Sequence, residues 1–493
     1  MKASYRELPA RLAVLVILGL SVACSDTKTA VEFCLEGAFD LGARYQGMQP
    51  SAGERYPTRF CYIVDDAQDR VMFHGRGQSN PDMHGEWTVS FLPPDKVRIV
   101  NRQSPPDIEF AGKNIEDEAS RYRRTDPKRL LAELESHPDW IKAQTDNGSF
   151  TVQYPGSQFE AEVLVVGGRL QEVRTLTDIP LRGRVPVVWR WKWPNEDAPQ
   201  LTMLVGEDVV FAAQGAWRTL STTETDALWQ LSGDQEVIDV PGDRWPAQIS
   251  LETQPVAAGV HLVTGVRTGF AHLVIETAKG LVVADAPAGW VELQQLPPAD
   301  LVPGYSISEL SENFIDYLGQ QFPETPIRAV VITHAHDDHA GGARAFAAAG
   351  AEIYAPRRVT DFLNEALNHP AMPGDRLSEM NGSVNVIPVH DQLTLDDDSN
   401  QVELLVLPRG PHVDTAIGVW AKDADAFFQS DLHVPRSDAD TPREDRAVAE
   451  CWFAEWATAN LPPDTVVLNS HSSPRTPVSR LSKYVDSATC REQ

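Results

Sequence analysis

The chain of 493 residues is longer than one ordinary domain, which favours two folded domains and a targeting segment. Its apolar fraction of 42% and charged fraction of 23% are those of a globular protein. The formal net charge of −27 argues against nucleic acid as a partner, because phosphate binding requires clustered Lys and Arg, and it indicates no particular substrate.

The first 23 residues have the pattern of an export signal. A positively charged start precedes an apolar run at residues 12–20, which is too short to span a bilayer comfortably. A small-residue cleavage site then stands directly before Cys24, an arrangement that resembles a bacterial lipoprotein box with a lipidated cysteine. Ser25 would permit transfer to the outer membrane, so we expect a periplasmic protein that contacts the membrane only through Cys24. Plain secretion with cleavage after Ala23 and an uncleaved anchor are the alternatives.

Cysteine usage agrees with export. Apart from Cys24, four cysteines remain, an even number as expected in an oxidising compartment. Pairing Cys34 with Cys61, and Cys451 with Cys490, would keep each disulfide inside one predicted domain, although four cysteines allow three connectivities. A metal site with cysteine ligands is disfavoured, because no cysteine has closely spaced Cys or His neighbours.

Residues 30–240 form the first predicted domain, which is rich in β structure. Short alternating segments separated by Pro and Gly turn signals are typical of an antiparallel sheet, and they suggest a half-barrel or sandwich. One helix is expected to interrupt the strands at residues 125–140, where a Thr-Asp-Pro sequence provides the start signal. The run 189–193 alternates Trp with Arg and Lys, and it predicts a strand with a solvent-facing aromatic edge. No catalytic constellation is found in this domain.

Residues 256–488 form the second predicted domain, in which strands and helices alternate. Helices are expected at residues 308–322, 341–349, 359–367, 446–459 and 477–488. No long hydrophobic span interrupts the alternation, so we do not expect a transmembrane segment.

Four potential metal ligands follow the apolar run 329–332: His334, His336, Asp338 and His339. The run is expected to form a buried strand, which places the cluster on the turn where the strand ends. Neutral imidazole nitrogen and carboxylate oxygen are the ligands that Zn²⁺ prefers, and a catalytic zinc site leaves one position open for water. An exposed polar loop with chance histidines is the alternative, but four candidates with alternating spacing at a strand end favour a metal site.

The sequence His-x-His-x-Asp-His resembles the signature of the metallo-β-lactamase superfamily, and residues 256–485 carry the resemblance. It implies an α+β chain whose C-terminal domain is a four-layer αββα sandwich with a metal site at one edge, preceded here by the β-rich domain. It also implies four further site positions, each found after an apolar run: Asp285, His412, Asp431 and His471. His433 is a competing ligand two residues after Asp431.

The resemblance assigns a role to each of these residues. The implied ligands are His334, His336 and His412 for one Zn²⁺, Asp338, His339 and His471 for a second, and Asp431 for both. Asp285 is implied to support the site by hydrogen-bonding a ligand histidine. Two zinc ions can share a hydroxide that acts as nucleophile near neutral pH, and Asp338 is the expected proton acceptor. Iron and manganese are the alternative metals.

An aspartate at position 431, rather than Cys or Ser, resembles the lactonase, glyoxalase II and phosphodiesterase branches. Export disfavours work on a cytosolic thioester, and the acidic chain disfavours nuclease action. We therefore expect a dinuclear zinc hydrolase of a small ester, lactone or lactam, with a pocket walled by residues 286–303, 370–379 and 433–444. The alternatives are a hydrolase of a sulfate ester or phosphodiester on the same metals, and an envelope binding or assembly lipoprotein with a vestigial metal site.

Overall fold

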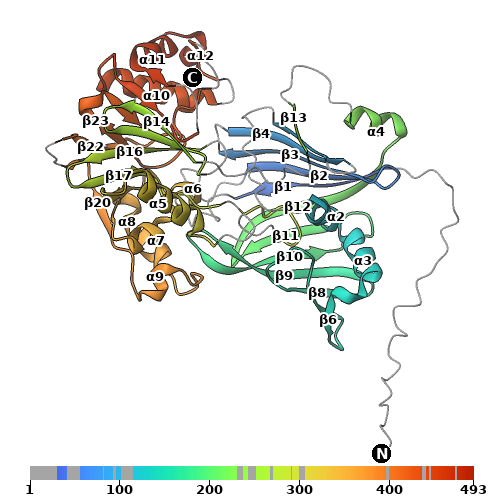
Figure 1. The fold of residues 1–493 in the computed structure, drawn as a ribbon. Coiled ribbons are helices and arrows are strands. Elements are labelled where there is room, and N and C mark those ends of the chain that lie inside the picture. The colour runs from blue at the N-terminus through green and yellow to red at the C-terminus, as the bar shows by residue number, and fades with distance from the viewer. Residues whose placement is uncertain are drawn as a thin grey trace, which may run out of the picture.

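The fold is described from a computed structural model of the chain (Figure 1). The described residues are 30–40, 56–80, 83–92, 96–101, 115–229, 237–241, 251–266, 270–289, 291–298, 306–395, 399–435, 440–443, 446–471 and 475–492. The expected export signal at residues 1–23 and Cys24 lie outside these ranges. Within them, no helix combines the length and the apolar character needed to cross a membrane.

The first part of the chain forms one antiparallel sheet of thirteen strands over the described residues. Its strands are β1 (Val31–Phe39), β2 (Tyr56–Asp65), β3 (Arg70–Asn80), β4 (Met83–Leu92), β5 (Lys96–Asn101), β6 (Ile141–Gln144), β7 (Ser149–Val152), β8 (Ala161–Val166), β9 (Arg169–Ile179), β10 (Gly183–Lys192), β11 (Gln200–Val205), β12 (Asp208–Thr219) and β13 (Val237–Pro241). The spatial order is β13-β5-β4-β3-β2-β1-β12-β11-β10-β9-β8-β7-β6. Side chains from both halves of the sheet share one core, so the sheet must bend around it.

Three helices accompany this sheet: α2 (Ile115–Arg124), α3 (Pro127–Ser136) and α4 (Thr222–Trp229). Helix α3 begins as predicted, because the Asp126 carboxylate accepts a hydrogen bond from the backbone N–H of Lys128 (2.9 Å) and Pro127 occupies the first turn. The predicted helix ends early, and a short 3₁₀ turn, η2 (Pro138–Trp140), replaces its last residues. Helices α2 and α4 were not predicted. The sequence of α2 is dominated by charged residues, although Tyr122 is fully buried, and α4 is only eight residues long with little amphipathic periodicity.

The expectation of a solvent-facing aromatic edge at residues 189–193 was wrong. Trp189 and Trp191 are 2% and 1% exposed and lie in the core of the sheet. Arg190 and Lys192, which alternate with them on β10, are exposed. The alternation had been recognised, but the period of a strand does not say which of its two faces is buried.

The second part of the chain forms two sheets. The seven-stranded sheet contains β14 (Glu252–Ala257), β15 (Val260–Thr264), β16 (Ala271–Thr277), β17 (Gly280–Ala284), β18 (Ile327–Val331), β19 (Glu352–Pro356) and β20 (Val386–Val389). The six-stranded sheet contains β21 (Gln392–Leu395), β22 (Val402–Leu407), β23 (Ala416–Ala421), β24 (Ala426–Phe428), β25 (Val466–Leu468) and β26 (Thr476–Pro477). An apolar core with residues from both sheets lies between them, so the sheets pack face to face.

Helices cover the outer faces of both sheets. The helices are α5 (Glu309–Gln321), α6 (Asp337–Ala340), α7 (Ala343–Ala348), α8 (Arg357–Leu367), α9 (Arg376–Glu379), α10 (Ala447–Asn460), α11 (Val478–Val485) and α12 (Ala488–Arg491), with a 3₁₀ turn, η4 (Lys422–Ala424). Helices α5, α7 and α8 share a core with the first sheet, and α10 and α11 share one with the second. The expected four-layer αββα sandwich is therefore confirmed, and the predicted helix 477–488 is divided into α11 and α12.

Two disulfides fasten the two parts of the chain internally. Cys34 on β1 is bonded to Cys61 on β2, and Cys451 on α10 is bonded to Cys490 on α12. This is the preferred pairing of the three connectivities that four cysteines allow.

Candidate metal centre

The histidine cluster lies where β18 ends in the interior of the sandwich. The last residues of this strand are fully buried, and the backbone of Ile332 still pairs with Tyr354 on β19 (N···O 2.8 Å). The chain then turns, and His336 precedes the first residue of the short helix α6 with an extended backbone. This local geometry turns His334 and His336 toward each other, with 3.0 Å between Nε2 of His334 and Nδ1 of His336.

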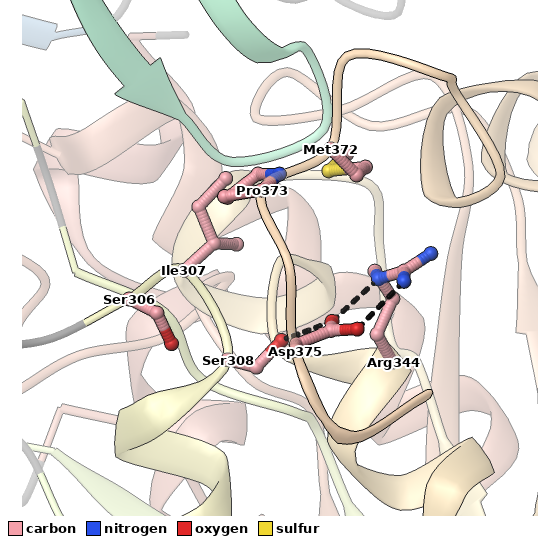
Figure 2. Close-up of a pocket in the computed structure, with 7 residues that line it drawn as sticks. All are labelled: Ser306, Ile307, Ser308, Arg344, Met372, Pro373 and Asp375. Atoms are coloured by element: carbon pink, nitrogen blue, oxygen red, sulfur yellow. Dashed lines mark hydrogen bonds and ion pairs between the residues drawn. The ribbon is translucent and has the colours of Figure 1, made fainter. Parts of the chain in front are cut away.

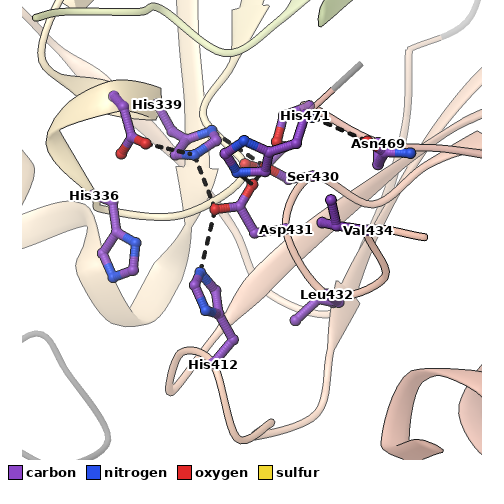
Figure 3. A network of polar contacts seen from close by, with 12 residues as sticks. His336, His339, His412, Ser430, Asp431, Leu432, Val434, Asn469 and His471 are labelled. Carbon is purple, nitrogen blue, oxygen red and sulfur yellow. Dashed lines mark hydrogen bonds and ion pairs between the residues drawn. The ribbon is translucent and has the colours of Figure 1, made fainter. Parts of the chain in front are cut away.

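Two long-range partners complete a first group of potential ligands. His412 comes from the loop after β22, and Asp431 from the loop after β24 (Figure 3). The ligand atoms of His334, His336, His412 and Asp431 all lie within 4.8 Å of one another. Oδ2 of Asp431 is 3.3 Å from Nε2 of His412 and 3.8 Å from Nε2 of His334.

A second group shares Asp431 with the first. It consists of His339 on α6, Asp431, and His471 after β25, again with ligand atoms within 4.8 Å of one another. Oδ2 of Asp431 is 3.2 Å from Nε2 of His339, and Oδ1 is 3.1 Å from Nε2 of His471. Asp338 belongs to neither compact group, but its Oδ2 is 3.5 Å from Nε2 of His339. Each predicted ligand therefore lies at one site, with Asp431 at its centre.

Asp285 lies beneath the ligands and is fully buried. It follows β17 with a φ of 68°, a left-handed conformation that is unusual for aspartate. Oδ1 accepts hydrogen bonds from the backbone N–H and the hydroxyl of Thr333, both at 2.8 Å. Oδ2 lies 2.8 Å from Nδ1 of His339. If the proton of His339 is on Nδ1, this hydrogen bond leaves Nε2 facing Asp431 with a free lone pair.

Sequence reasoning missed two serines and an arginine that hold Asp431. The hydroxyl of Ser470 donates to Oδ1 of Asp431, and the hydroxyl of Ser430 lies 3.3 Å from the same oxygen. Ser430 also lies 3.2 Å from Oδ2 of Asp285, which links the two carboxylates. The Arg446 guanidinium donates to the backbone carbonyl of Asp431. Each serine directly precedes a predicted ligand, a position with no sequence signal of its own.

The electrostatics of the cluster favour uncharged imidazoles beside an ionised carboxylate. Burial, reinforced by neighbouring His339 and His336, lowers the pKa of His334 well below its usual value. Burial and His412 lower the pKa of His336 to about 3, and burial also lowers the pKa of His412. Burial alone would raise the pKa of Asp431, but its histidine neighbours outweigh burial and lower it well below the usual value.

His339 differs from the other histidines. Burial alone would lower its pKa, but the carboxylates of Asp431 and Asp338 outweigh burial and raise the pKa well above the usual value. A positive charge on His339 would therefore be stabilised by these carboxylates. A metal cation bound at the same place would be stabilised by them in the same way.

The donor set fits a transition metal. Nε2 of His339 and Nε2 of His412 are buried and complete no hydrogen bond of good geometry within the described residues, although each faces Asp431. Buried imidazole nitrogens that face a shared carboxylate in this way are the donor atoms that a cation beside Asp431 would require. Five imidazoles with two carboxylates match the preferences of zinc, and also those of iron and manganese.

Two other candidates do not belong to this centre. His433 is 1% exposed, stacks on Phe453 and places Nε2 3.3 Å from the hydroxyl of Thr476, so the expected competition with Asp431 is not seen. Glu32 lies near Cys34 and Cys61, but both sulfur atoms are engaged in a disulfide.

The comparisons with known proteins concern the C-terminal domain. Residues 310–471 match a family model described as the Metallo-beta-lactamase superfamily. None of the curated proteins matches the chain. A solved metallo-beta-lactamase from Pontibacter korlensis is 18% identical, with 50% of this chain and 100% of that chain covered and a TM-score of 0.35. A metallo beta lactamase from Hirschia baltica is 18% identical, with 49% of this chain and 96% of that chain covered and a TM-score of 0.33. The stereoselective inverting sec-alkylsulfatase Pisa1 from Pseudomonas sp. is 16% identical, with 47% of this chain and 40% of that chain covered and a TM-score of 0.32.

Proposed function

We infer that the protein is a metal-dependent hydrolase that uses two metal ions to cleave a small ester, lactone or lactam. The match of residues 310–471 to the metallo-beta-lactamase superfamily supports the enzyme class, and the two groups of possible ligands support the two metal ions. The observation that carries the proposal is the sharing of Asp431. One carboxylate lies between two groups of imidazoles, so the same aspartate would serve as a ligand in each group. His334, His336 and His412 would hold one cation, and His339, Asp338 and His471 the other.

Bound zinc would acidify a water molecule and polarise a carbonyl oxygen, so no serine or cysteine nucleophile is required. The protein's own residues would orient these groups. Asp285 fixes the ring of His339. Asp338 is the natural proton acceptor, because its side chain is 15% exposed while that of Asp431 is 7% exposed. A proton taken up by Asp338 could therefore pass to solvent more easily than one held by Asp431.

The proposed substrate class rests on chemistry and charge. A net charge of −27 would repel polyanions such as nucleic acid, so it disfavours nuclease action and leaves the choice among small substrates to the chemistry of the site. Sulfate esters and phosphodiesters are the alternative, and no described contact favours them over a carbonyl substrate. The vestigial-site alternative conflicts with Asp285 and with the serines around Asp431, because they still hold ligand residues in place.

Metal content of the purified protein tests the proposal. About two equivalents of zinc, iron or manganese are expected in the wild type, and clear losses in Asp431→Ala and His336→Ala. His390→Ala, a change at an exposed histidine, provides the matched control and should keep the full metal content. A panel of lactones, β-lactams and linear esters, with sulfate esters and phosphodiesters beside them, then identifies the bond. A wild type that neither carries nor takes up metal would refute the proposal.

We also propose that the protein is exported and anchored through Cys24. Two disulfides support an oxidising compartment, because such bonds rarely persist in the cytosol. Mass spectrometry of the N-terminus distinguishes the alternatives. A lipidated Cys24 would support the anchor, whereas an unmodified Cys24 at the N-terminus would indicate plain secretion.

A further inference from the structure

We propose that the tip of the β9–β10 hairpin, residues 180–183, is a positioning element for the metal centre. The inference rests on the proposed function, since it concerns the affinity of that centre for metal. The hairpin belongs to the N-terminal sheet, but its tip packs into the C-terminal domain beside the helix that carries His339. It gives the N-terminal domain, which contains no predicted ligand, a direct role in the site.

The tip is anchored by a buried leucine. Leu181 is 2% exposed and belongs to the core of the C-terminal domain, together with Ala335, Ala340 and Ala343. These alanines flank or end the short ligand segment that contains His336 and His339. Leu181 has a φ of 62°, a left-handed conformation that is unfavourable for a leucine. Burial of its apolar side chain offsets this strain.

Gly341 marks the point of closest approach between the tip and the ligand segment. A Cβ atom at this position would lie 2.7 Å from Cβ of Pro180 and 2.7 Å from Cβ of Ala288. The residue directly after helix α6 is therefore in close contact with the hairpin tip on one side and with the chain that follows Asp285 on the other. Pro180 is therefore one of the residues that confine the end of α6, together with Ala288 and with the hydrogen bonds that join Ala286 to the backbone of His339 and Gly342.

A second contact fixes the far side of the tip. The backbone N–H of Arg184 donates to the carbonyl of Ala371 (2.6 Å), and a Cβ at Gly183 would lie 2.6 Å from that carbonyl carbon. Figure 2 shows the hairpin, in teal, passing beside Met372 and Pro373. Below this loop, the Arg344 guanidinium pairs with Asp375 in a shallow hollow that Ser308 and Met372 also line.

The tip is also fastened to its own sheet. The Arg182 guanidinium donates to Oδ2 of Asp208 (2.7 Å) and to the carbonyl of Val205 (3.3 Å), both at the β11–β12 turn. Leu181 and Pro180 are therefore presented by a braced turn and not by a free loop. A shift of the N-terminal sheet would therefore move Pro180 and Leu181 relative to the end of α6.

The opposite side of the ligand segment is held by a reciprocal insertion. After Asp285, residues 286–289 and 291–298 lead into the core of the N-terminal sheet, where Val291, Leu293 and Leu296 are at most 1% exposed. The hydroxyl of Tyr62 donates to the carbonyl of Gln294 (2.7 Å). The described part of the loop 286–303 is thus buried between the domains, and its expected contribution to the substrate pocket stays a prediction.

Two segments pack against α6, the hairpin tip and the chain that follows Asp285, and both depend on contacts with the N-terminal domain. Asp285 is held through the loop that follows it, and the end of α6 is held by Pro180 and Leu181. Metal affinity requires ligand atoms to be placed within a fraction of an ångström, so a loosened α6 should bind metal more weakly at His339.

The test compares three leucine-to-alanine variants of the purified protein, each expressed as the full chain. Leu181→Ala removes the anchor. Leu363→Ala removes a fully buried leucine of the same core on α8, and Leu176→Ala removes a 43% exposed leucine on β9. Each metal-free protein is titrated with Zn²⁺ against a chromophoric chelator, and its thermal midpoint is measured without metal.

We expect Leu181→Ala to weaken zinc binding on the order of 10-fold, as losses of supporting residues around metal ligands do. Leu363→Ala should lower the thermal midpoint by a similar amount and keep the wild-type affinity, and Leu176→Ala should change neither. Unchanged affinity in Leu181→Ala, or an equal loss in Leu363→Ala, would overturn the inference and leave the proposed function intact. A wild type that binds no zinc would instead refute the proposed function, and this inference with it.

Discussion

Replacing Asp285 with asparagine tests how the centre is supported from within. The side chain is fully buried, and its Oδ2 lies 2.8 Å from Nδ1 of His339. Asparagine has nearly the same shape and keeps one oxygen for the two hydrogen bonds from Thr333. Its amide N–H would then face the N–H of His339, and two donors cannot pair. The imidazole proton must move to Nε2, the atom that faces Asp431 at 3.2 Å.

The size of the effect follows from these contacts. With the proton on Nε2, the asparagine amide can donate to Nδ1, so Asp285→Asn exchanges a charge-assisted hydrogen bond for a neutral one and should fold with a stability loss of about 1 kcal/mol. Loss of the hydrogen-bond partner of a metal-binding histidine lowers metal affinity about 10–100-fold. The affinity of the second group, which contains His339, should fall by this factor. The group of His334, His336 and His412 should be affected less, because none of these histidines bonds to Asp285 directly in the described contacts.

Zinc titration of the metal-free protein, with urea unfolding in parallel, measures both quantities. Asp126→Asn is the matched control, because Asp126 is 3% exposed and accepts hydrogen bonds from Lys128 and from the Trp217 indole (both 2.9 Å), far from the ligands in sequence. This control should bind two zinc ions like the wild type. The reasoning is refuted if Asp285→Asn keeps wild-type affinity at both sites.

Three further outcomes are expected. Ser470→Ala removes the hydroxyl that donates to Asp431 and should weaken zinc binding about 2–10-fold, measured by the same titration. Burial would raise the pKa of Asp375, but hydrogen bonds from its arginine and serine partners outweigh burial and lower it to about 2. Because this folded-state pKa lies below the unfolded value near 4, the Arg344–Asp375 pair stabilises the fold by about 2 kcal/mol above about pH 4. This stabilisation is lost as the pH falls toward 2. Asp375→Asn should therefore lack this acid-dependent part of the free energy of unfolding. Replacing both cysteines of the Cys451–Cys490 disulfide by serine opens a 39-residue loop and should cost about 4 kcal/mol in urea unfolding.

Each of these outcomes has a control. Ser479→Ala, at an exposed serine, should leave zinc affinity unchanged, and an equal loss there would contradict the role of Ser470. Asp361→Asn alters a carboxylate that is 83% exposed and should keep the wild-type acid dependence. In the serine double variant, a reductant should lower the free energy of unfolding only by breaking the remaining Cys34–Cys61 bond. Equal free energies of unfolding for this variant and the wild type, without reductant, would show that the Cys451–Cys490 bond adds no stability.

The ligand residues were predictable because each ends a buried strand. Asp285, His412, Asp431 and His471 all follow apolar runs, and the carboxyl ends of such strands meet at one edge of the sandwich. Ser430 and Ser470 were not predictable, because small polar residues at strand ends are common and their partner is set by the fold alone. Ser430 also has a φ of 66°, a conformation that its sequence does not signal.

The N-terminal domain was predicted less well, and for a physical reason. Its strands were recognised from their alternation, but the orientation of β10 and the presence of α2 depend on what each face packs against. That core is completed by Leu293 and Leu296, which lie outside the predicted domain. A pattern read within residues 30–240 cannot reveal a partner that the chain supplies later.

The reciprocal insertion has a consequence for how the chain folds. The hydrogen bond between Tyr62 and Gln294 joins residues 232 positions apart, and that between Arg124 and Leu296 joins residues 172 apart. Contacts of such sequence separation form slowly, because a long loop must close before they stabilise anything. During synthesis, the first sheet would stay incomplete until residues 286–298 have emerged, with part of its aromatic core open to solvent and to wrong partners. We therefore expect the two halves to unfold in one cooperative transition, and the first half, produced alone, to aggregate.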